Sequence, residues 1–210
     1  MIQALTYQEM LHKIKDKARE NGIIDGYVGI LITRPDLETG KNILKSLEYY
    51  HYLTRGNIIF YLPGYGAYWY GAYPDGKVVT EIDGVQWSFS NKEFVQFIHE
   101  MENYSKWKYC GESELLLLHT KDGILSYEVM MQFRLDNMLR DKVIDSIPSY
   151  FQELFRLFEN KDSLEQISDA LGMDKLVEMA GEGILDKLPG GVGKLIKHEK
   201  YLCVKNMKKD

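Results

Sequence analysis

The chain has 210 residues, of which 45% are hydrophobic and 27% are charged, and its formal net charge is −5. This composition is typical of a globular protein, and it excludes disordered and fibrous classes. The negative charge argues against a protein whose main task is to coat nucleic acid, because that task needs a basic surface. The length allows one fully cored domain with an appendage, or two small domains.

The reactive and metal-binding residue types form no recognised pattern. Cys110 and Cys203 lie far apart and share no metal-ligand or redox spacing, and the histidines form no HxxxH or HxH pair. We therefore expect no metal and no cofactor. No apolar run approaches the ~20 residues that span a bilayer, and the N-terminus is polar where a signal peptide needs an apolar core. These features predict a cytoplasmic protein without a transmembrane segment.

The N-terminal third predicts a helix and then a β-α-β unit. Thr6 and Glu9 have the spacing of a capping box, and the helical pattern that follows them ends at Asn21. Two nearly continuous apolar runs come next, separated by a helical pattern, so we expect two buried parallel strands joined by a helix. The expected elements are a strand at 27–33, a helix at 41–54 and a strand at 57–62.

Two hairpins and two helices are expected after the β-α-β unit. Asp83 and Asp122 each precede a glycine between two strand-like runs, and Asp-Gly favours a type I′ turn because both central residues need positive φ. The hairpin strands are expected at 78–82 with 85–89 and at 114–119 with 124–135. The helices are expected from the capping box of Ser90 and Glu93 to about Ser105, and at 147–159.

These elements predict an α/β domain, with an α+β type of mixed sheet in a three-layer arrangement. Without the first hairpin, the element order after the N-terminal helix is β-α-β-α-β-β-α, which resembles the thioredoxin-like topology. The redox motif of that fold is absent, because residues 33–41 contain no cysteine. We expect the domain to comprise residues 1–160, and residues 161–210 to form a helical, glycine-rich appendage that packs on it or on a partner.

Two basic residues lie between the end of the first expected strand and the start of the helix that follows it. Ligands of open α/β sheets often bind at this place, so Arg34 and Lys41 are candidate ligands for a phosphate-bearing small molecule such as a nucleotide. The alternative is an ordinary loop with solvated charges. Arg55, with His51 and an acidic residue near 112–114, would join Arg34 if the strand ends meet at one edge of the sheet. His51 lies on an apolar helix face, so we expect no catalytic residue here.

The segment 60–73 contains seven aromatic residues in fourteen positions, set among glycines. A loop must satisfy its own backbone polar groups, so these side chains cannot all point into a core. Exposed tyrosine and tryptophan provide large, rigid contact areas, which are typical of protein interfaces. The alternative is that they cover an open face of the sheet. The candidate partner-binding residues are Tyr61, Tyr65, Tyr68, Trp69 and Tyr70.

The sequence thus favours a non-catalytic binding or interaction module that acts in a larger assembly through the aromatic segment. We expect a protein partner or self-association. The alternative function is an enzyme or sensor that binds a nucleotide-like molecule at the end of the first strand. The C-terminal tail combines apolar and basic residues, which also suits contact with a membrane surface. Its interspersed acidic residues favour packing on its own domain instead.

Overall fold

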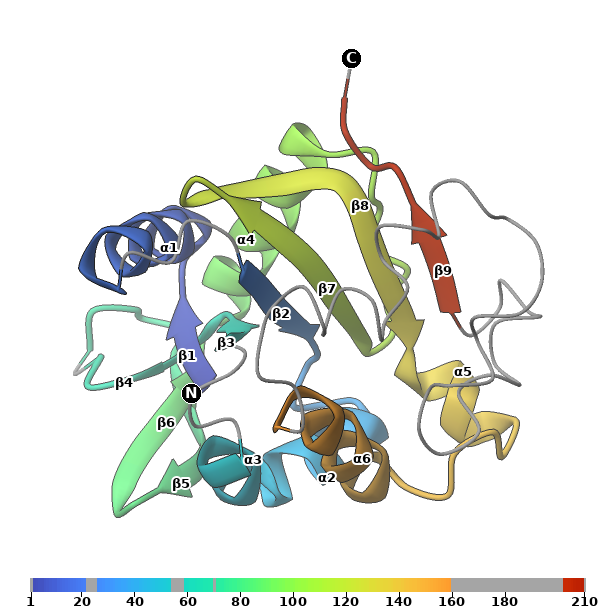
Figure 1. The fold of residues 1–210 in the computed structure, drawn as a ribbon. Coiled ribbons are helices and arrows are strands. Elements are labelled where there is room, and N and C mark those ends of the chain that lie inside the picture. The colour runs from blue at the N-terminus through green and yellow to red at the C-terminus, as the bar shows by residue number, and fades with distance from the viewer. Residues whose placement is uncertain (1, 22–25, 54–58, 70, 160–201, 210) are drawn as a thin grey trace.

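The structure is a computed structural model that describes residues 2–21, 26–53, 59–69, 71–159 and 202–209 (Figure 1). A six-stranded sheet lies at its centre, with the strand order β1-β3-β2-β7-β8-β9. In chain order, these strands are β1 (Ile2–Leu5), β2 (Gly26–Ile32), β3 (Ile59–Pro63), β7 (Glu114–Lys121), β8 (Ile124–Arg134) and β9 (Leu202–Lys205).

The central sheet is mixed, as the sequence predicted. β1, β3 and β2 are parallel, with Gly29 of β2 opposite Phe60 of β3. β7 is antiparallel to β2, β8 is antiparallel to β7, and β9 is antiparallel to β8. The second expected hairpin is confirmed, since Asp122 and Gly123 between β7 and β8 have φ values of 53° and 72°.

Six helices accompany the sheet in the described part of the chain. They are α1 (Tyr7–Asn21), α2 (Glu38–Lys45), α3 (Leu47–Leu53), α4 (Asn91–Tyr104), α5 (Leu135–Arg140) and α6 (Ile147–Glu159). α1 packs on α4, where the rings of Tyr7 and Phe97 lie 5.4 Å apart. α6 contacts α2 and α3, and the ring centroid of its Phe155 lies 5.0 Å from that of Phe60 in β3. Figure 1 shows α6 in front of the central sheet and α4 behind it.

The first predicted hairpin belongs to a second, smaller sheet, which the sequence did not predict. β5 (Lys77–Ile82) and β6 (Val85–Phe89) form the hairpin, and β6 also pairs with β4 (Tyr65–Ala67). The turn has the expected positive φ values, 51° at Asp83 and 74° at Gly84. β4 follows β3 after Gly64, whose φ of 78° turns the chain from one sheet into the other.

Several boundaries differ from the sequence prediction. The helix expected at 41–54 is two helices, α2 and α3, which meet at Ser46. β1, β9 and α5 were not predicted, since each has only four to six residues and too little pattern to be recognised. The helices at 7–21, 91–104 and 147–159 are confirmed, and so is the parallel pairing of the strands in the β-α-β unit.

Leu202–Lys205 join the central sheet as β9, whereas the sequence predicted a helical appendage for all of 161–210. β9 pairs with β8, and Met207 then bonds to two further segments: its amide donates to the Tyr127 carbonyl (2.8 Å), and its carbonyl accepts from the Lys106 amide (2.7 Å). The rest of the predicted appendage, residues 160–201, lies outside the described residues. None of the helices that the structure describes is long and apolar enough to cross a membrane.

Candidate functional site

The structure divides the aromatic segment 60–73 into a buried part and a surface part. Tyr61 and Tyr65 are 1% and 0% exposed, so they belong to the core and are not available to a partner of the folded protein. This corrects the prediction that they are contact residues. Tyr68 is 65% exposed, and Trp69 is half-buried at the surface. Tyr70, the fifth predicted contact residue, lies outside the described residues.

Strand pairing explains why Tyr65 is buried. β4 forms the edge of the small sheet, with Tyr65 opposite Phe89 of β6, and the two rings lie 4.8 Å apart. The Tyr65 hydroxyl donates a hydrogen bond of 3.2 Å to the carbonyl of Thr33, just beyond the end of β2. This buried ring therefore joins the small sheet to the central sheet. Burial also raises the pKa of Tyr65, because it disfavours the phenolate.

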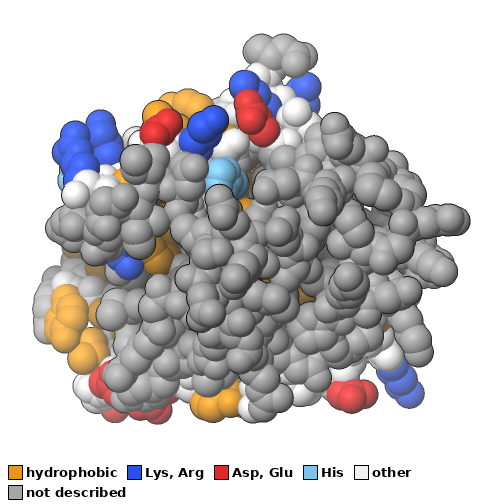
Figure 2. Space-filling model, viewed as in Figure 1, with side chains coloured by type: hydrophobic (Ala, Val, Ile, Leu, Met, Phe, Trp, Pro, Cys, Tyr) orange, Lys and Arg blue, Asp and Glu red, His pale blue; other side chains and the backbone are white. Residues whose placement is uncertain are grey.

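The chain leaves β4 in a strained conformation that keeps Tyr68 at the surface. Tyr68 has a φ of 60°, which is rare for a bulky residue and costs on the order of 1–3 kcal/mol. Trp69 then folds back over Gly66 and packs edge-on against Tyr73, with ring centroids 4.5 Å apart. We call Tyr68, Trp69 and Tyr73 the aromatic surface. Figure 2 shows hydrophobic side chains exposed on the side of the molecule where Figure 1 labels β4.

Asp75 fixes the far end of the aromatic surface to α4. Its carboxylate accepts hydrogen bonds from the Ser90 hydroxyl (2.7 Å) and from the Lys92 amide (2.9 Å). These bonds, led by the one from the Lys92 amide, lower the pKa of Asp75. Since Asp75 lies at the N-terminus of α4, its charge also complements the helix dipole. The aromatic surface is thus held by β4 at one end and by Asp75 at the other.

Two further carboxylates act on Tyr73 through their charge, and the sequence did not indicate this arrangement. The pKa of Tyr73 is raised, first by partial burial and then by the negative charges of Glu93 in α4 and Glu9 in α1. Glu93 is only 7% exposed. Its capping-box spacing predicted a bond to the Ser90 amide, but that amide donates to the Gly64 carbonyl instead (2.8 Å). No hydrogen bond to the Glu93 carboxylate is present among the described residues.

At the carboxyl end of β2, both predicted anion-binding residues are paired with nearby acids. Arg34 forms two hydrogen bonds to Asp36, of 3.0 and 2.8 Å, and Lys41 lies 3.5 Å from Glu38 in an exposed ion pair. These acids offset the positive charge that a phosphate would require. Arg55 lies outside the described residues, and the side chain of His51 is likewise not described.

A buried carboxylate lies near this end of the sheet. Glu114, the first residue of β7, is 0% exposed and accepts hydrogen bonds from Trp107 Nε1 (3.1 Å), Gln132 Nε2 (2.8 Å) and the Cys110 thiol. All three contacts are donors, which matches the acceptor capacity of a carboxylate. Burial raises the pKa of Glu114, although the three hydrogen bonds oppose this shift. The Glu114 carboxylate is therefore satisfied by donors from within the protein.

Cys110 is unsuited to thiol chemistry even though the residue is exposed. Its pKa is raised to about 12, first by burial of the thiol and then by the hydrogen bond and the charge of Glu114. The thiolate is the nucleophilic form, so a raised pKa suppresses reactivity. This agrees with the absence of a redox motif in the sequence.

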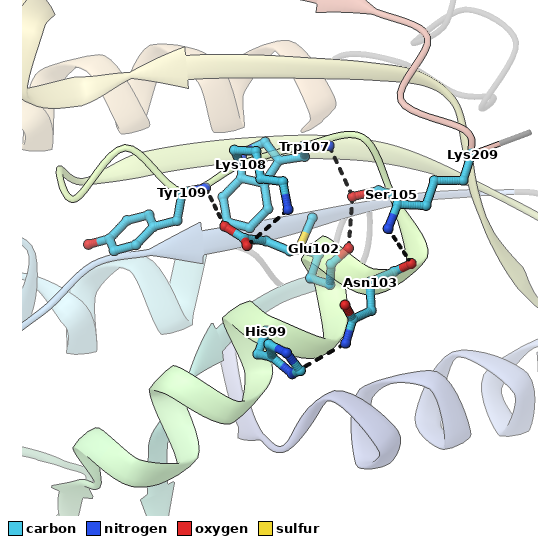
Figure 3. Close-up of polar contacts among 9 residues, drawn as sticks. His99, Glu102, Asn103, Ser105, Trp107, Lys108, Tyr109 and Lys209 are labelled. Carbon is cyan, nitrogen blue, oxygen red and sulfur yellow. Dashed lines mark hydrogen bonds and ion pairs between the residues drawn. The ribbon is translucent and has the colours of Figure 1, made fainter.

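The end of α4 holds the segment that carries Trp107 and Tyr109 (Figure 3). Glu102 accepts a hydrogen bond from the Tyr109 amide (3.0 Å) and pairs with Lys108 Nζ (3.1 Å). The Ser105 hydroxyl donates to the Met101 carbonyl (2.8 Å) and accepts from the Trp107 amide (3.3 Å). These local bonds, together with the C-terminal strand, give the segment a structural role.

Comparisons with known proteins add no functional information about these residues. The chain matches no family model, no curated protein and no solved structure. Within the described ranges, no three His, Cys, Asp or Glu side chains are grouped so as to hold a metal ion. The aromatic surface is therefore the candidate site, on the basis of its own exposure and geometry.

Proposed function

We propose that this protein is a non-catalytic binding module that contacts a protein partner in a larger assembly through the aromatic surface of Tyr68, Trp69 and Tyr73. The observation that carries the proposal is the 65% exposure of Tyr68 at a backbone φ of 60°. A folded chain rarely keeps a bulky residue in this strained conformation without a compensating role. Exposed tyrosine and tryptophan are the residues that most often dominate interface energies.

Preorganisation adds support to this proposal. Ordering a flexible side chain on binding costs about 0.5–1.5 kcal/mol. Trp69 is already confined between Gly66 and Tyr73, and the segment is anchored by the two hydrogen bonds of Asp75. A partner would therefore meet rings whose conformational entropy has largely been lost during folding. The same rigidity is typical of matured binding surfaces.

The alternative, an enzyme or sensor that binds a nucleotide-like molecule at the end of β2, has less support. Arg34 and Lys41 are both paired with acids, and the carboxylate of Asp136 lies close by, bonded to the Ser113 amide. A phosphate would have to displace Asp36 from a bidentate pair with Arg34. A thermal-shift screen with nucleotides tests the alternative, which requires a shift that Arg34→Ala abolishes.

We also propose a thioredoxin-like topology for the main domain. The support comes from the element order: apart from β4, β5, β6 and the short α5, the chain from β2 onward runs strand, helical segment, strand, helix, strand, strand and helix. β1, α1 and β9 are additions to that order. An experimental structure in which β7 does not lie between β2 and β8 would contradict the proposal. Such a topology would carry no function by itself.

Affinity capture from extract of the protein's own cells tests the binding function. We expect Tyr68→Ala to reduce recovery of specific partners by at least about tenfold, which corresponds to ~1.4 kcal/mol of binding free energy. Tyr104→Ala is the matched control, because Tyr104 is a tyrosine of similar exposure, 58%, at the other end of α4. An unchanged set of partners with Tyr68→Ala and with Trp69→Ala would refute the proposal.

A further inference from the structure

The outer face of the small sheet continues the aromatic surface. Gly66 of β4, Ser88 of β6 and Val78 of β5 lie opposite one another across the three strands. Directly opposed residues point their side chains to the same face of a sheet. The Trp69 ring fills the space beside Gly66 where a side chain would lie, so the ring is on this face as well. One row across the sheet therefore carries an indole ring, a hydroxyl and the side chain of Val78, which is 59% exposed.

Two polar atoms in this row are available to a ligand. Neither the Ser88 hydroxyl nor Trp69 Nε1 makes a hydrogen bond to any residue that the structure describes. Both residues are partly exposed, and neither atom is among the buried polar atoms without a partner, so both atoms reach solvent. The indole N–H can only donate, and a hydroxyl can donate as well. The row therefore suits a ligand that brings carbonyl oxygens.

The spacing of the row indicates which backbone fits it. Neighbouring strands lie about 4.8 Å apart, so Val78 and the ring over Gly66 are about 9.6 Å apart along the row. A polyproline II helix brings every third residue back to the same side after about 9.3 Å, and its carbonyl oxygens have no internal hydrogen bonds. An extended strand repeats after about 6.8 Å. An α-helix needs seven residues to span about 10.5 Å, and its carbonyl oxygens are already bonded.

We propose that the partner presents a proline-rich segment in the polyproline II conformation, which lies along this row. One of its residues packs on Trp69, the third residue after it packs on Val78, and its carbonyl oxygens accept hydrogen bonds from Trp69 Nε1 and the Ser88 hydroxyl. This inference rests on the proposed binding function and specifies the chemistry of the partner. Aromatic surfaces recognise such segments because the polyproline II helix is formed before binding, which lowers the entropic cost.

Binding of two labelled nine-residue peptides to the full chain tests the proposal. One peptide is polyproline, the other consists of flexible Gly-Ser-Gly repeats, and both have blocked termini. Fluorescence anisotropy measures the affinities. We expect polyproline to bind at least about tenfold more tightly, with a change in tryptophan fluorescence because Trp69 is in the site. Since the contact involves no charged group, raising the salt concentration should change the affinity less than about twofold.

Two matched valine variants test where the peptide binds. Val78→Ser removes the apolar group at one end of the row, and we expect it to weaken polyproline binding at least about fivefold. Val95→Ser makes the same change at a valine of similar exposure, 55%, on α4, and should change the affinity less than about twofold. Ser88→Ala removes one of the two donors and should weaken binding about threefold. Thermal melting checks that each variant remains folded.

The outcomes separate this inference from the binding function itself. Equal or undetectable binding of the two peptides, or equal losses with Val78→Ser and Val95→Ser, would overturn the inference of a proline-rich partner. If Tyr68→Ala still reduced partner capture in that case, the binding function would stand and the partner would use another conformation, such as a helix. If capture were unchanged with Tyr68→Ala and with Trp69→Ala, the binding function would fail, and this inference with it.

Discussion

The indole ring of Trp69 fills the space that a side chain at Gly66 would occupy. A Cβ placed on Gly66 would come within 1.8 Å of Trp69 Cε2 and 2.1 Å of Nε1. Both are far below van der Waals contact, so the glycine and the tryptophan determine each other's positions. This relationship explains how a segment rich in glycine presents ordered aromatic rings.

Gly66→Ala should therefore displace the Trp69 ring and destabilise the protein. Overpacking of this kind costs about 1–3 kcal/mol, and the lost contact between Trp69 and Tyr73 adds to it. Urea denaturation would measure the free energy of unfolding. In the double variant with Trp69→Ala, the alanine at position 66 should cost less than about 0.5 kcal/mol, because the ring that it displaces is gone. An equal cost in both backgrounds would show that the ring is not the obstacle.

Tyr65→Phe and Tyr61→Phe form a matched pair of predictions in the core. Both residues are buried, but the Tyr65 hydroxyl donates to the Thr33 carbonyl, whereas the Tyr61 hydroxyl has no hydrogen-bond partner among the residues that the structure describes. We expect Tyr65→Phe to lower the free energy of unfolding by about 1 kcal/mol. Tyr61→Phe should leave it unchanged or raise it by up to about 1 kcal/mol, because it removes an unsatisfied buried group. The same urea experiment compares them, and equal losses would be inconsistent with these contacts.

The local signals in the sequence predicted much of the fold. The Asp-Gly turns at Asp83 and Asp122 and the cap at Ser90 depend on residues only a few positions apart, and the structure contains all three. β1 and β9 depend instead on pairing with strands that are distant in the sequence, and four residues carry too little pattern to predict this. The separation of β5 and β6 from the central sheet is likewise a matter of long-range pairing.

The candidate site was predictable only in part. The density of aromatic residues marked the segment, but it did not distinguish the core residues Tyr61 and Tyr65 from the exposed Tyr68. That distinction depends on the pairing of β4 with β6. The sequence pattern around Glu93 predicts a hydrogen bond from the Ser90 amide to its carboxylate. It could not reveal that the Ser90 amide donates to the distant Gly64 carbonyl instead. The effect of Glu9 on the pKa of Tyr73 depends on where α1 packs, which the sequence does not encode locally.

Glu114→Ala should be among the more destabilising single changes in the described part of the protein. It leaves Trp107 Nε1 and Gln132 Nε2 without this acceptor in a buried position. Each unsatisfied buried donor costs about 1–3 kcal/mol, so we expect a total loss of at least about 2 kcal/mol by urea denaturation. The control is Glu112→Ala, which removes a partly exposed ion pair with Arg140 and should cost less than about 1 kcal/mol. Similar losses for both variants would argue against the role of Glu114 as a buried acceptor.

The Cys110 thiol should react slowly with alkylating reagents at pH 8. Its pKa of about 12, raised from the model-compound value of 9.0, lowers the thiolate fraction about a thousandfold. A more basic thiolate is also a stronger nucleophile, which offsets part of the loss of reaction rate. We therefore expect a rate ~30-fold below that of a free cysteine. Iodoacetamide labelling of a Cys203→Ser background, followed by mass spectrometry, would measure the rate. In the same background unfolded in urea, Cys110 should react like a free thiol.

The cause of the raised pKa is tested by Glu114→Gln, which removes the nearby charge but can still accept the thiol hydrogen bond. The labelling rate at pH 8 should rise several-fold, because the negative charge no longer opposes the thiolate.

The raised pKa of Cys110 also makes the stability of the fold depend on pH. Folding favours the neutral thiol, so its contribution to stability is complete below pH 9 and is lost as the pH rises toward about 12. A wild-type labelling rate equal to that of free cysteine would show that the folded protein exposes the thiol and that Glu114 does not hold it.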